Sequence, residues 1–429
     1  MAEMISTLYE KYLASDGVST DTRKIAPDSI FFALKGPNFD ANKFAQEAIE
    51  KGAKYAVVDD EKYVMSDQYI LVDDTLKSLQ ALATHHRSQL KIPVIGITGS
   101  NGKTTTKELM NAVLSKKFKT LATIGNLNNH IGVPLTILSI TDKIEIAIIE
   151  MGASKGGDIE ELCHIALPTH GLITNIGQAH TEGFGGIEGV IKGKNELYRY
   201  LSETGGKVFA NSTNEILMDL VKVFDKPYFY PQSSDYYNCE LVESEPFLVI
   251  KAGNGKLIET NLIGTYNFEN VAAALCVGKF FEVKYKKANK AISNYSSTNN
   301  RSQILKKGSN TIISDAYNAN PVSMMAAIDN CKSMKAENKV LILGDMNELG
   351  DSSVVAHENI GNYTSGAQFT QVIFVGKKMK DAHNENPTSI YFEKPELLKE
   401  FLSQSPIEDA LILIKASRSL GLEQVIEYL

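Results

Sequence analysis

The stretch Pro93-Val-Ile-Gly-Ile-Thr-Gly-Ser-Asn-Gly-Lys-Thr-Thr-Thr-Lys107 places an apolar run, a glycine-containing turn and a threonine-rich segment one after another. Residues 94–97 predict a buried strand and residues 107–114 predict a helix. Glycines let backbone N–H groups approach an anion closely, and a helix N-terminus adds unpaired donors and the positive end of a dipole. The stretch is therefore typical of a phosphate-binding loop.

This loop departs at one position from the common pattern G-x-x-x-x-G-K-S/T, because Ile97 stands where the first glycine is expected. We expect Lys103 to reach the terminal phosphates of ATP and Thr104 to offer its hydroxyl group to Mg²⁺. An ordinary glycine-rich turn between a strand and a helix is the alternative. The residues expected to bind ATP in the loop are Thr98, Gly99, Ser100, Asn101, Gly102, Lys103, Thr104 and Thr105.

Length and composition limit the classes of protein that the chain can represent. Its 429 residues are too many for one hydrophobic core and predict about three domains. The net charge of −7 argues against general nucleic-acid binding, which needs a basic face, but allows an anionic substrate. The four cysteines form no C-x-x-C pair and no long apolar run occurs. We therefore expect no zinc cluster, no membrane span and a cytoplasmic protein.

Apolar runs and the segments between them predict an α/β fold with three domains. Residues 1–85 form a small α/β unit with three short β-rich runs. Residues 86–297 alternate strands and helices at the spacing of a parallel sheet. A polar linker, residues 294–300, leads into the segment 298–429. A second parallel, Rossmann-like sheet is predicted there. The strands expected in the last two segments are 94–97, 144–149, 171–174 and 207–210, then 311–314, 339–343, 371–375 and 410–414.

Polar residues follow the expected strands of the central segment, and ligands bind at the carboxyl ends of strands in parallel sheets. Glu150 ends an apolar run and is well placed to hold the Mg²⁺ of a nucleotide, with a helix cap as the alternative. His180 lies in a polar, glycine-rich loop, where contact with a metal or phosphate and a structural role are both open. Lys192 and Lys194 follow on the next helix and could equally be solvated.

Three further segments offer polar groups to a ligand. The run Ser19-Thr-Asp-Thr-Arg23 suits a diphosphate or nucleotide, although a cap or turn is the simpler interpretation. The run Asn126-Leu-Asn-Asn129 suits a sugar or peptide amide, or again a turn. Lys415 and Arg418 follow a strand and suit a clamp on a transferring phosphate, unless they are simply solvated.

Taken together, the motifs resemble the Mur ligase family, which includes the folylpolyglutamate synthases. The shared motifs are Thr98–Thr105, Glu150–Gly152, Thr174-Asn175 with His180, and Arg301 with Asp315. Others resemble the branch that joins D-alanyl-D-alanine to a UDP-N-acetylmuramoyl-tripeptide, and together they extend from residue 19 to residue 418. These are Ser19–Arg23, Phe32–Gly36, Gly125–Asn129, Ile131–Pro134, residues 179–185, Tyr317–Pro321, Gly344–Gly350 and Lys415–Arg418.

The resemblance implies a ligase that uses ATP to activate the tripeptide carboxylate as an acyl phosphate, which the dipeptide amine then attacks. It implies two Mg²⁺ ions, one held by Thr104 and Glu150 and the other by His180 and a carbamylated lysine. Lys194 is the best match to that lysine and Lys192 is the second. The resemblance also implies small-molecule partners, no nucleic acid and a monomer. The catalytic residues that it implies are Lys103, Lys194, His180, Lys415 and Arg418.

Further site residues follow from the same resemblance. Asn270, Arg301 and Asp315 match positions that contact ATP. Ala416 stands where the family usually has glycine, which would strain a turn that needs a positive φ, and Ser314 replaces a common acid. The residues expected to bind the UDP-sugar are Ser19, Arg23, Asn126, Asn128 and Asn129, and those expected near ATP and the dipeptide are Tyr317, Asn318 and Asn320.

Three alternatives remain at this point. Another amino-acid ligase of the family that adds the third residue would carry an Asp-Asn-Pro-Arg motif, which this sequence does not contain. A folylpolyglutamate synthase would not need the N-terminal α/β unit. A non-catalytic ATP-binding regulator would need the phosphate loop but not Glu150, His180 and Lys194 together.

Overall fold

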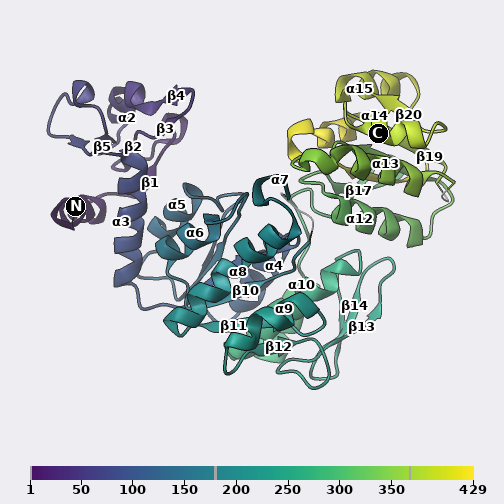
Figure 1. The fold of residues 1–429 in the computed structure, drawn as a ribbon, viewed down its shortest axis with the longest axis horizontal. Helices are drawn as coiled ribbons and strands as arrows, with labels where there is room; N and C mark the ends of the chain where they lie inside the picture. Colours follow the sequence, from purple (N-terminus) through teal and green to yellow (C-terminus); the bar gives the residue numbers. More distant parts are fainter. Residues whose placement is uncertain (1, 178–180, 367–368) are drawn as a thin grey trace.

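The computed structural model describes residues 2–177, 181–366 and 369–429, which form a three-domain α/β fold (Figure 1). Each domain is built around its own sheet of mainly parallel strands. The N-terminal and C-terminal domains lie at opposite ends of the molecule in Figure 1, with the central domain between them.

The N-terminal domain has a four-stranded parallel sheet in the order β1-β2-β5-β6. Branched and aromatic residues fill its strands, as expected for a pleated surface that is buried on both faces. One face is covered by η2 (Ala41–Phe44) and α2 (Ala45–Glu50), and a small hairpin of β3 (Lys35–Gly36) and β4 (Phe39–Asp40) lies beside it. The sheet strands are Val18–Ser19, Ile30–Phe32, Tyr55–Val58 and Tyr69–Leu71.

The N-terminal and central domains share one hydrophobic core. Helix α3 (Thr75–Gln89) begins at Asp74, whose side chain accepts a hydrogen bond from the N–H of Lys77, and it packs on α1 (Ala2–Leu13) and α5 (Gly132–Leu138). Leu82 on α3 is fully buried in a cluster that includes residues of both sheets. Because α3 continues past residue 85, we propose that the boundary between these domains lies at residues 90–93.

The central sheet is parallel throughout and has the order β12-β11-β10-β7-β9-β8. Strand β7 (Val94–Thr98) lies in the middle and all of its residues are buried, which explains its continuous apolar run. The registers pair Ile97 with Glu150 and Thr98 with Ile173, so the three central strands end at the same edge. The other strands are β8 Thr120–Ala122, β9 Ile146–Glu150, β10 His170–Ile173, β11 Lys207–Asn211 and β12 Tyr228–Tyr230.

Helices cover both faces of the central sheet (Figure 1). On one face α4 (Lys103–Leu114) packs closely on α10 (Tyr266–Phe280) and α11 (Tyr285–Ser293), and on the other α6 (Asp158–Ala166) packs on α8 (Ile187–Thr204). The short α7 (Thr181–Phe184) precedes α8, and α9 (Glu215–Leu220) follows β11.

An antiparallel three-stranded sheet extends the central domain, and the sequence did not predict it. Its strands are β13 (Glu240–Glu243), β14 (Val249–Lys251) and β15 (Leu257–Glu259). Each has three or four residues and carries charged side chains, so no apolar run marks it. Only Ile250 and Ile258 of these strands are buried, and they cover the α10 side of the domain.

The C-terminal sheet has the order β16-β17-β21-β18-β19-β20 and is parallel apart from the edge strand β16 (Gln303–Lys307). Its register places Asp315 at the end of β17 opposite Lys415 at the end of β21. The remaining strands are β17 Asn310–Asp315, β18 Lys339–Gly344, β19 Gln371–Val375, β20 Ile390–Phe392 and β21 Leu411–Lys415, and the helices are α12 Pro321–Ser333, α13 Ser353–Thr364, α14 Met379–Glu385 and α15 Pro395–Gln404.

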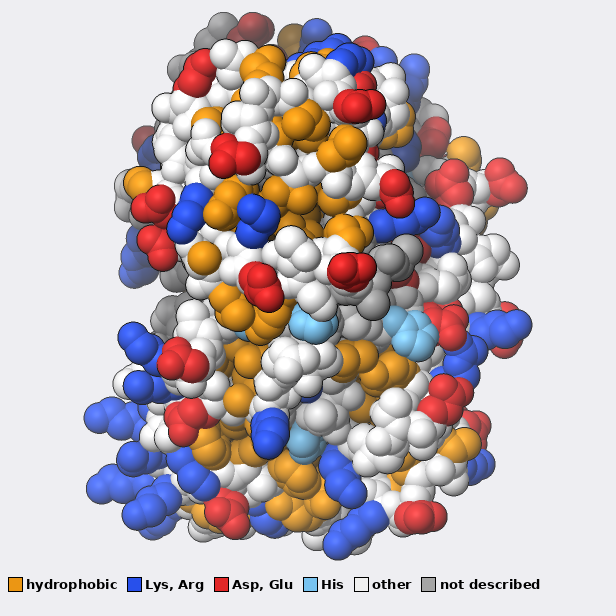
Figure 2. All heavy atoms as spheres, turned by 90° about the vertical axis from the view of Figure 1, so that its left-hand side faces the viewer, with side chains coloured by type: hydrophobic (Ala, Val, Ile, Leu, Met, Phe, Trp, Pro, Cys, Tyr) orange, Lys and Arg blue, Asp and Glu red, His pale blue; other side chains and the backbone are white. Residues whose placement is uncertain are grey.

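The face of the molecule on the N-terminal side carries side chains of both charges interspersed with apolar ones (Figure 2). Among the apolar side chains exposed in this domain are Leu13 and Phe39, which are 64% and 57% exposed. In the described part of the chain, every helix is too short or too polar to cross a membrane.

Replacing Leu82 by alanine tests the shared core. We expect Leu82→Ala to lower the free energy of unfolding by about 2–5 kcal/mol, because it leaves a cavity where both domains meet. Leu13→Ala, at an exposed position of α1, is the matched control and should change it by less than about 0.5 kcal/mol. Urea unfolding followed by circular dichroism measures both, since the chain has no tryptophan. Equal effects of the two substitutions would contradict a core that continues through α3.

Candidate active site

A cavity of about 1190 Å³ lies where the carboxyl edge of the central sheet faces the C-terminal domain. The loop after β7, the turns after β9 and β10, and the start of α10 line one side of it. The linker and the turns after β17 and β21 line the other. The predicted site residues that line the cavity are Ser100, Asn101, Gly102, Lys103, Thr104, Thr105, Asn126, Asn128, Asn129, Glu150, Asn270, Arg301, Asp315, Tyr317, Asn318, Asn320, Lys415 and Arg418.

The phosphate loop is held in shape by the turn that follows β10. Asn101 donates its N–H to the Asn175 side chain at 2.9 Å, and its carbonyl accepts a hydrogen bond from the Thr174 hydroxyl at 2.6 Å. The Ser100 hydroxyl donates to the carbonyl of Gly177 at 3.0 Å. Gly102 has φ +79°, and a side chain there would meet Asn270. Gly99 has φ +142°, and a Cβ there would meet the Thr174 hydroxyl, so both glycines of the loop are required by its backbone and its neighbours.

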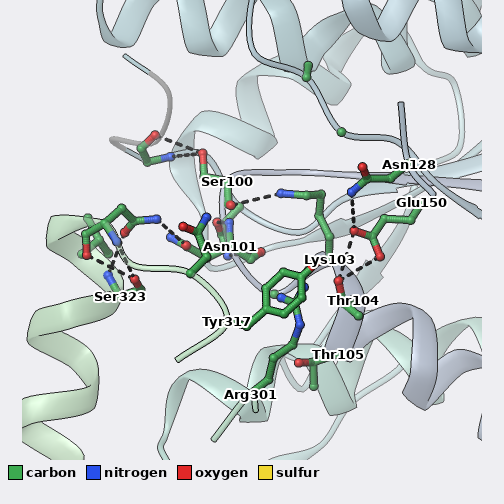
Figure 3. Close-up of a pocket in the computed structure, with 18 of the residues that line it drawn as sticks. Ser100, Asn101, Lys103, Thr104, Thr105, Asn128, Glu150, Arg301, Tyr317 and Ser323 are labelled. Atoms are coloured by element: carbon green, nitrogen blue, oxygen red, sulfur yellow. Dashed lines mark hydrogen bonds between the residues drawn. The ribbon is translucent and has the colours of Figure 1, made fainter. Parts of the chain in front are cut away.

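Lys103 lies over this loop, inside the cavity. Its ammonium group donates to the carbonyl oxygens of Gly99 at 2.6 Å and Ser100 at 3.1 Å (Figure 3). The pKa of Lys103 is lowered to about 8, mainly because the group is buried. Glu150 opposes this shift and Arg301 adds to it. The positive charge therefore sits against two carbonyl dipoles, and an anion in the loop would give it a stronger partner.

Glu150 is almost completely buried beside the first turn of α4. Its carboxylate accepts hydrogen bonds from the Thr104 hydroxyl at 2.9 and 3.1 Å and from the Asn128 amide at 2.9 Å (Figure 3). Lys107 lies 3.9 Å from the same carboxylate and donates to the carbonyl of Thr123 at 2.7 Å. Burial lowers the pKa of Lys107, while Glu150 and Glu108 raise it.

The oxygen atoms of Thr104 and Glu150 fit a magnesium ion. Mg²⁺ prefers oxygen ligands and is usually held by one or two protein groups together with phosphates and water. Among the described residues, no three His, Cys, Asp or Glu side chains converge into a metal site of their own. His180, predicted as a ligand of a second ion, lies outside the residues that the structure describes.

The C-terminal domain contributes an arginine and an asparagine to the cavity. The guanidinium of Arg301 lies 3.7 Å from the centre of the Tyr317 ring, and its buried Nε has no hydrogen-bond partner among the described residues (Figure 3). Asn320 caps α12 and donates its amide to the Asn101 side chain at 2.7 Å. The phosphate loop and the C-terminal domain are therefore in direct contact.

The predicted cationic pair already has partners within the C-terminal domain. Lys415 donates to Asp315 at 2.5 Å and to the Asn318 carbonyl at 3.0 Å, and Arg418 donates to Glu423 at 2.7 Å. Both cations line the cavity. Ala416 does not have a positive φ, so the strain that was considered for this turn is absent.

Lys194 is 1% exposed on α8 and lies outside the cavity lining, whereas Lys192 is exposed. The Nζ atom of Lys194 lies 5.3 Å from the centre of the Phe184 ring. Burial lowers the pKa of Lys194 to about 7, Lys103 lowers it as well, and Asp158 and Glu196 raise it. An amine whose pKa is lowered to about 7 is about half neutral at pH 7 and is therefore more nucleophilic than an ordinary lysine.

Some predicted residues lie elsewhere or already have other contacts. Asn270 binds Thr106 and Asn267 through its amide. Ser19 and Arg23 belong to the N-terminal domain and do not line the described cavity. Arg23 is 84% exposed and pairs with Asp21 at 2.8 Å. Thr98 and Gly99 lie just behind the cavity lining.

Sequence reasoning missed several residues that line the cavity. Ser154 and Lys155 lie in the turn after β9 and Asp158 begins α6, and their only signal was their place after a strand that ends in Glu150. Tyr266 and Ser302 lie at the interface of the two domains, where the Tyr266 hydroxyl and the Ser302 hydroxyl are 2.7 Å apart. A contact between residues so distant in sequence leaves no local pattern.

Three family models match consecutive parts of the chain: the Mur ligase family catalytic domain at residues 15–111, the Mur ligase middle domain at 97–278 and the Mur ligase glutamate ligase domain at 300–418. The chain belongs to the Mur ligase family. A relative from Bacillus subtilis is 36% identical over 425 residues, covering 96% of this Mur ligase and 92% of the relative. It is named UDP-N-acetylmuramoyl-tripeptide--D-alanyl-D-alanine ligase.

Other relatives and solved structures agree with this assignment. A relative from Escherichia coli with the same name is 32% identical and covers 96% of this Mur ligase and 93% of its own length. The crystal structure of MurF from Acinetobacter baumannii matches with a TM-score of 0.86 at 26% identity, covering 100% of this chain and 98% of the other. MurF from Thermotoga maritima in complex with ADP matches with a TM-score of 0.85 at 26% identity, covering 97% of each chain.

Replacing Gly102 by alanine tests the geometry of the phosphate loop. Its Cβ would lie 2.5 Å from the Asn270 side-chain oxygen in a backbone conformation that disfavours alanine. We expect Gly102→Ala to weaken ADP binding, measured by calorimetry, by about tenfold or more, which corresponds to about 1.4 kcal/mol. Gly205→Ala, at φ +72° with open space around it, is the control and should leave ADP binding unchanged. An unchanged affinity in Gly102→Ala would contradict the assigned loop.

Proposed function

We propose that this Mur ligase joins D-alanyl-D-alanine to UDP-N-acetylmuramoyl-tripeptide at the expense of ATP, in the synthesis of a peptidoglycan precursor. The observation that carries the proposal is the cavity in which the phosphate loop and Glu150 face Arg301, Tyr317 and Asn320 of the C-terminal domain. The relatives named as ligases of these substrates, over nearly the whole chain, support the same reaction.

In this proposal ATP lies with its phosphates on the loop from Thr98 to Thr105. Backbone N–H groups at the start of α4 and the ammonium of Lys103 bind the phosphate oxygens, and Lys103 exchanges its two carbonyl partners for them. The unpartnered Nε of Arg301 supports a contact with the same phosphates from the other domain. Asn270 and Asp315 remain proposed contacts of the nucleoside.

The reaction then has two covalent steps. An oxygen of the tripeptide carboxylate attacks the γ-phosphorus of ATP, so that a C–O–P link forms and ADP leaves. The neutral amine of D-alanyl-D-alanine attacks the acyl carbon. The tetrahedral adduct expels phosphate, which leaves with the proton that the nitrogen loses, and an amide remains. Charge builds up on phosphoryl and acyl oxygens in both steps, and preorganised cations lower the free energy of such transition states. Lys103, Arg301, Lys415 and Arg418 are the cations that we assign to this task.

Thr104 and Glu150 are the residues that would hold one Mg²⁺, which would neutralise phosphate charge when bound. We also propose a second ion, which would be held by His180 and by the carboxylate of a carbamylated Lys194. Its burial and its pKa of about 7 support this assignment, because only the neutral amine adds to carbon dioxide. Lys192, in contrast, is exposed.

The acceptor end of the cavity is proposed to hold the two peptide substrates. Asn126, Asn128 and Asn129 would face the UDP-sugar of the precursor, and Tyr317, Asn318 and Asn320 would contact the dipeptide and ATP. Ser19 and Arg23 of the N-terminal domain would bind the UDP end. We further propose that the ligase acts as a monomer in the cytoplasm, where ATP and UDP-linked precursors are available.

Release of phosphate from ATP tests the proposed function. We expect it to require both UDP-N-acetylmuramoyl-tripeptide and D-alanyl-D-alanine, and to stop when either is omitted. Tripeptides that end in lysine and in diaminopimelate are assayed in parallel, so that the preferred substrate is identified. Mass spectrometry of the product should show the added dipeptide. Release that does not depend on the dipeptide would contradict the proposal.

Replacing Lys194 by alanine tests the modified lysine. We expect Lys194→Ala to abolish product formation and short carboxylic acids to restore part of it, because they supply the missing carboxylate. Lys192→Ala is the matched control and should retain activity without added acid. Full activity of Lys194→Ala in the absence of acid would remove Lys194 from the site.

A further inference from the structure

Glu108 lies on α4 one turn beyond the phosphate loop, and none of the assignments above uses it. Its side chain is 28% exposed, and both of its carboxylate oxygens accept hydrogen bonds from the polar linker between the central and C-terminal domains. The Tyr295 hydroxyl donates to one oxygen at 2.5 Å, and the Asn299 amide donates to the other at 2.8 Å. The helix that begins at the phosphate site therefore holds the linker directly.

The linker between these bonds and β16 is tightly folded. The Ser297 hydroxyl donates to the Arg301 carbonyl at 2.7 Å and contacts the Asn299 side chain at 3.1 Å. Asn300 and Ser302 have φ values of +54° and +51°, which residues other than glycine adopt only where the surroundings enforce it. Arg301 lies between these two residues, so its position depends on the bonds that hold the linker.

Fixed contacts follow on the C-terminal side of Arg301. Ser302 donates its N–H to Asp315 at 2.9 Å, and the Asn300 side chain accepts a hydrogen bond from Ser314 at 3.1 Å. The guanidinium extends from this anchored backbone into the cavity and stacks on Tyr317. The placement of Arg301 therefore requires the central domain to hold the linker on one side and β17 to hold it on the other.

We propose that Glu108 is a positioning residue for the reaction: it fixes the linker so that Arg301 points at the phosphates bound in the first turn of the same helix. Phosphate binding and the placement of Arg301 are thereby coupled through the segment Thr104–Glu108 of α4. Lys107 reinforces the arrangement, since it lies 3.9 Å from Glu150 and 4.0 Å from Glu108. The inference rests on the proposed nucleotide site, because Glu108 acts on the bound phosphates only by placing Arg301.

A double-mutant cycle tests the proposal, with the β,γ-imido analogue of ATP and Mg²⁺ as the probe and calorimetry as the measurement. We expect Glu108→Ala to weaken binding about tenfold and Arg301→Ala to weaken it at least as much. The variant with both substitutions should bind no more weakly than Arg301→Ala alone, because residues that act as one unit are not additive. The matched control is Glu240→Ala, which removes an exposed carboxylate paired with Lys251 and should bind like the unchanged protein.

Two milder variants test the same proposal if Glu108→Ala fails to fold. Tyr295→Phe and Asn299→Ala each remove one bond to Glu108, and each should weaken binding severalfold in the unchanged protein and not at all in Arg301→Ala. In the ligase assay, KM for ATP should rise more than kcat falls. Multiplicative effects of Glu108→Ala and Arg301→Ala would overturn the inference, as would unchanged affinity in Glu108→Ala. Failure of the unchanged protein to bind the analogue would instead contradict the proposed nucleotide site.

Discussion

The carboxylate of Glu150 is buried at the end of β9, and burying a charged group is costly unless polar neighbours replace the lost water. The hydroxyl of Thr104 and the amide of Asn128 supply that replacement, and Lys107 lies close by. Thr104 lies in the first turn of α4 and Asn128 belongs to the loop after β8, so one carboxylate fixes two segments around the end of a third. The phosphate loop therefore has a defined position before any ligand enters.

The second half of the cavity depends on strand register in the C-terminal sheet. Asp315 and Lys415 end neighbouring strands at the same level, which brings a carboxylate and an ammonium together and directs both toward the central domain. The turn after β17 then carries Tyr317 and Asn320 to the phosphate loop. Neither sheet alone presents a complete set of cations and polar groups, so the chemistry requires both.

Much of this arrangement was predictable because it follows from local patterns. A continuous apolar run before Gly99 and another before Glu150 indicate buried parallel strands, and the carboxyl ends of such strands meet at one edge. The strands from Glu240 to Glu259 were missed because each has only three or four residues and carries charged side chains, so no apolar run marks them. The family resemblance favoured Lys194 over Lys192, but the burial of Lys194 could not be derived from the sequence, because exposure depends on how α8 packs on the sheet.

The bonds of Glu108 were equally hidden, since its partners lie nearly two hundred residues away in the sequence. Ser19 and Arg23 illustrate the opposite case. Their hydroxyl and guanidinium groups suggested a ligand, and in the structure they contact the neighbouring Asp21. Residue type alone thus identified polar groups, whereas only the fold showed which of them converge.

The continuous core through α3 also determines how the molecule can move. Large apolar interfaces resist relative motion, whereas polar contacts and short linkers allow it. The N-terminal sheet is tied to the central sheet by buried side chains such as Leu82, so we expect these two domains to move together. The C-terminal sheet meets this pair of domains through polar pairs such as Asn320 with Asn101, through the segment around Arg301, and through Ile263, which is buried in the C-terminal core cluster. We therefore expect any change in the width of the cavity to occur at the junction with the C-terminal domain and not between the first two sheets.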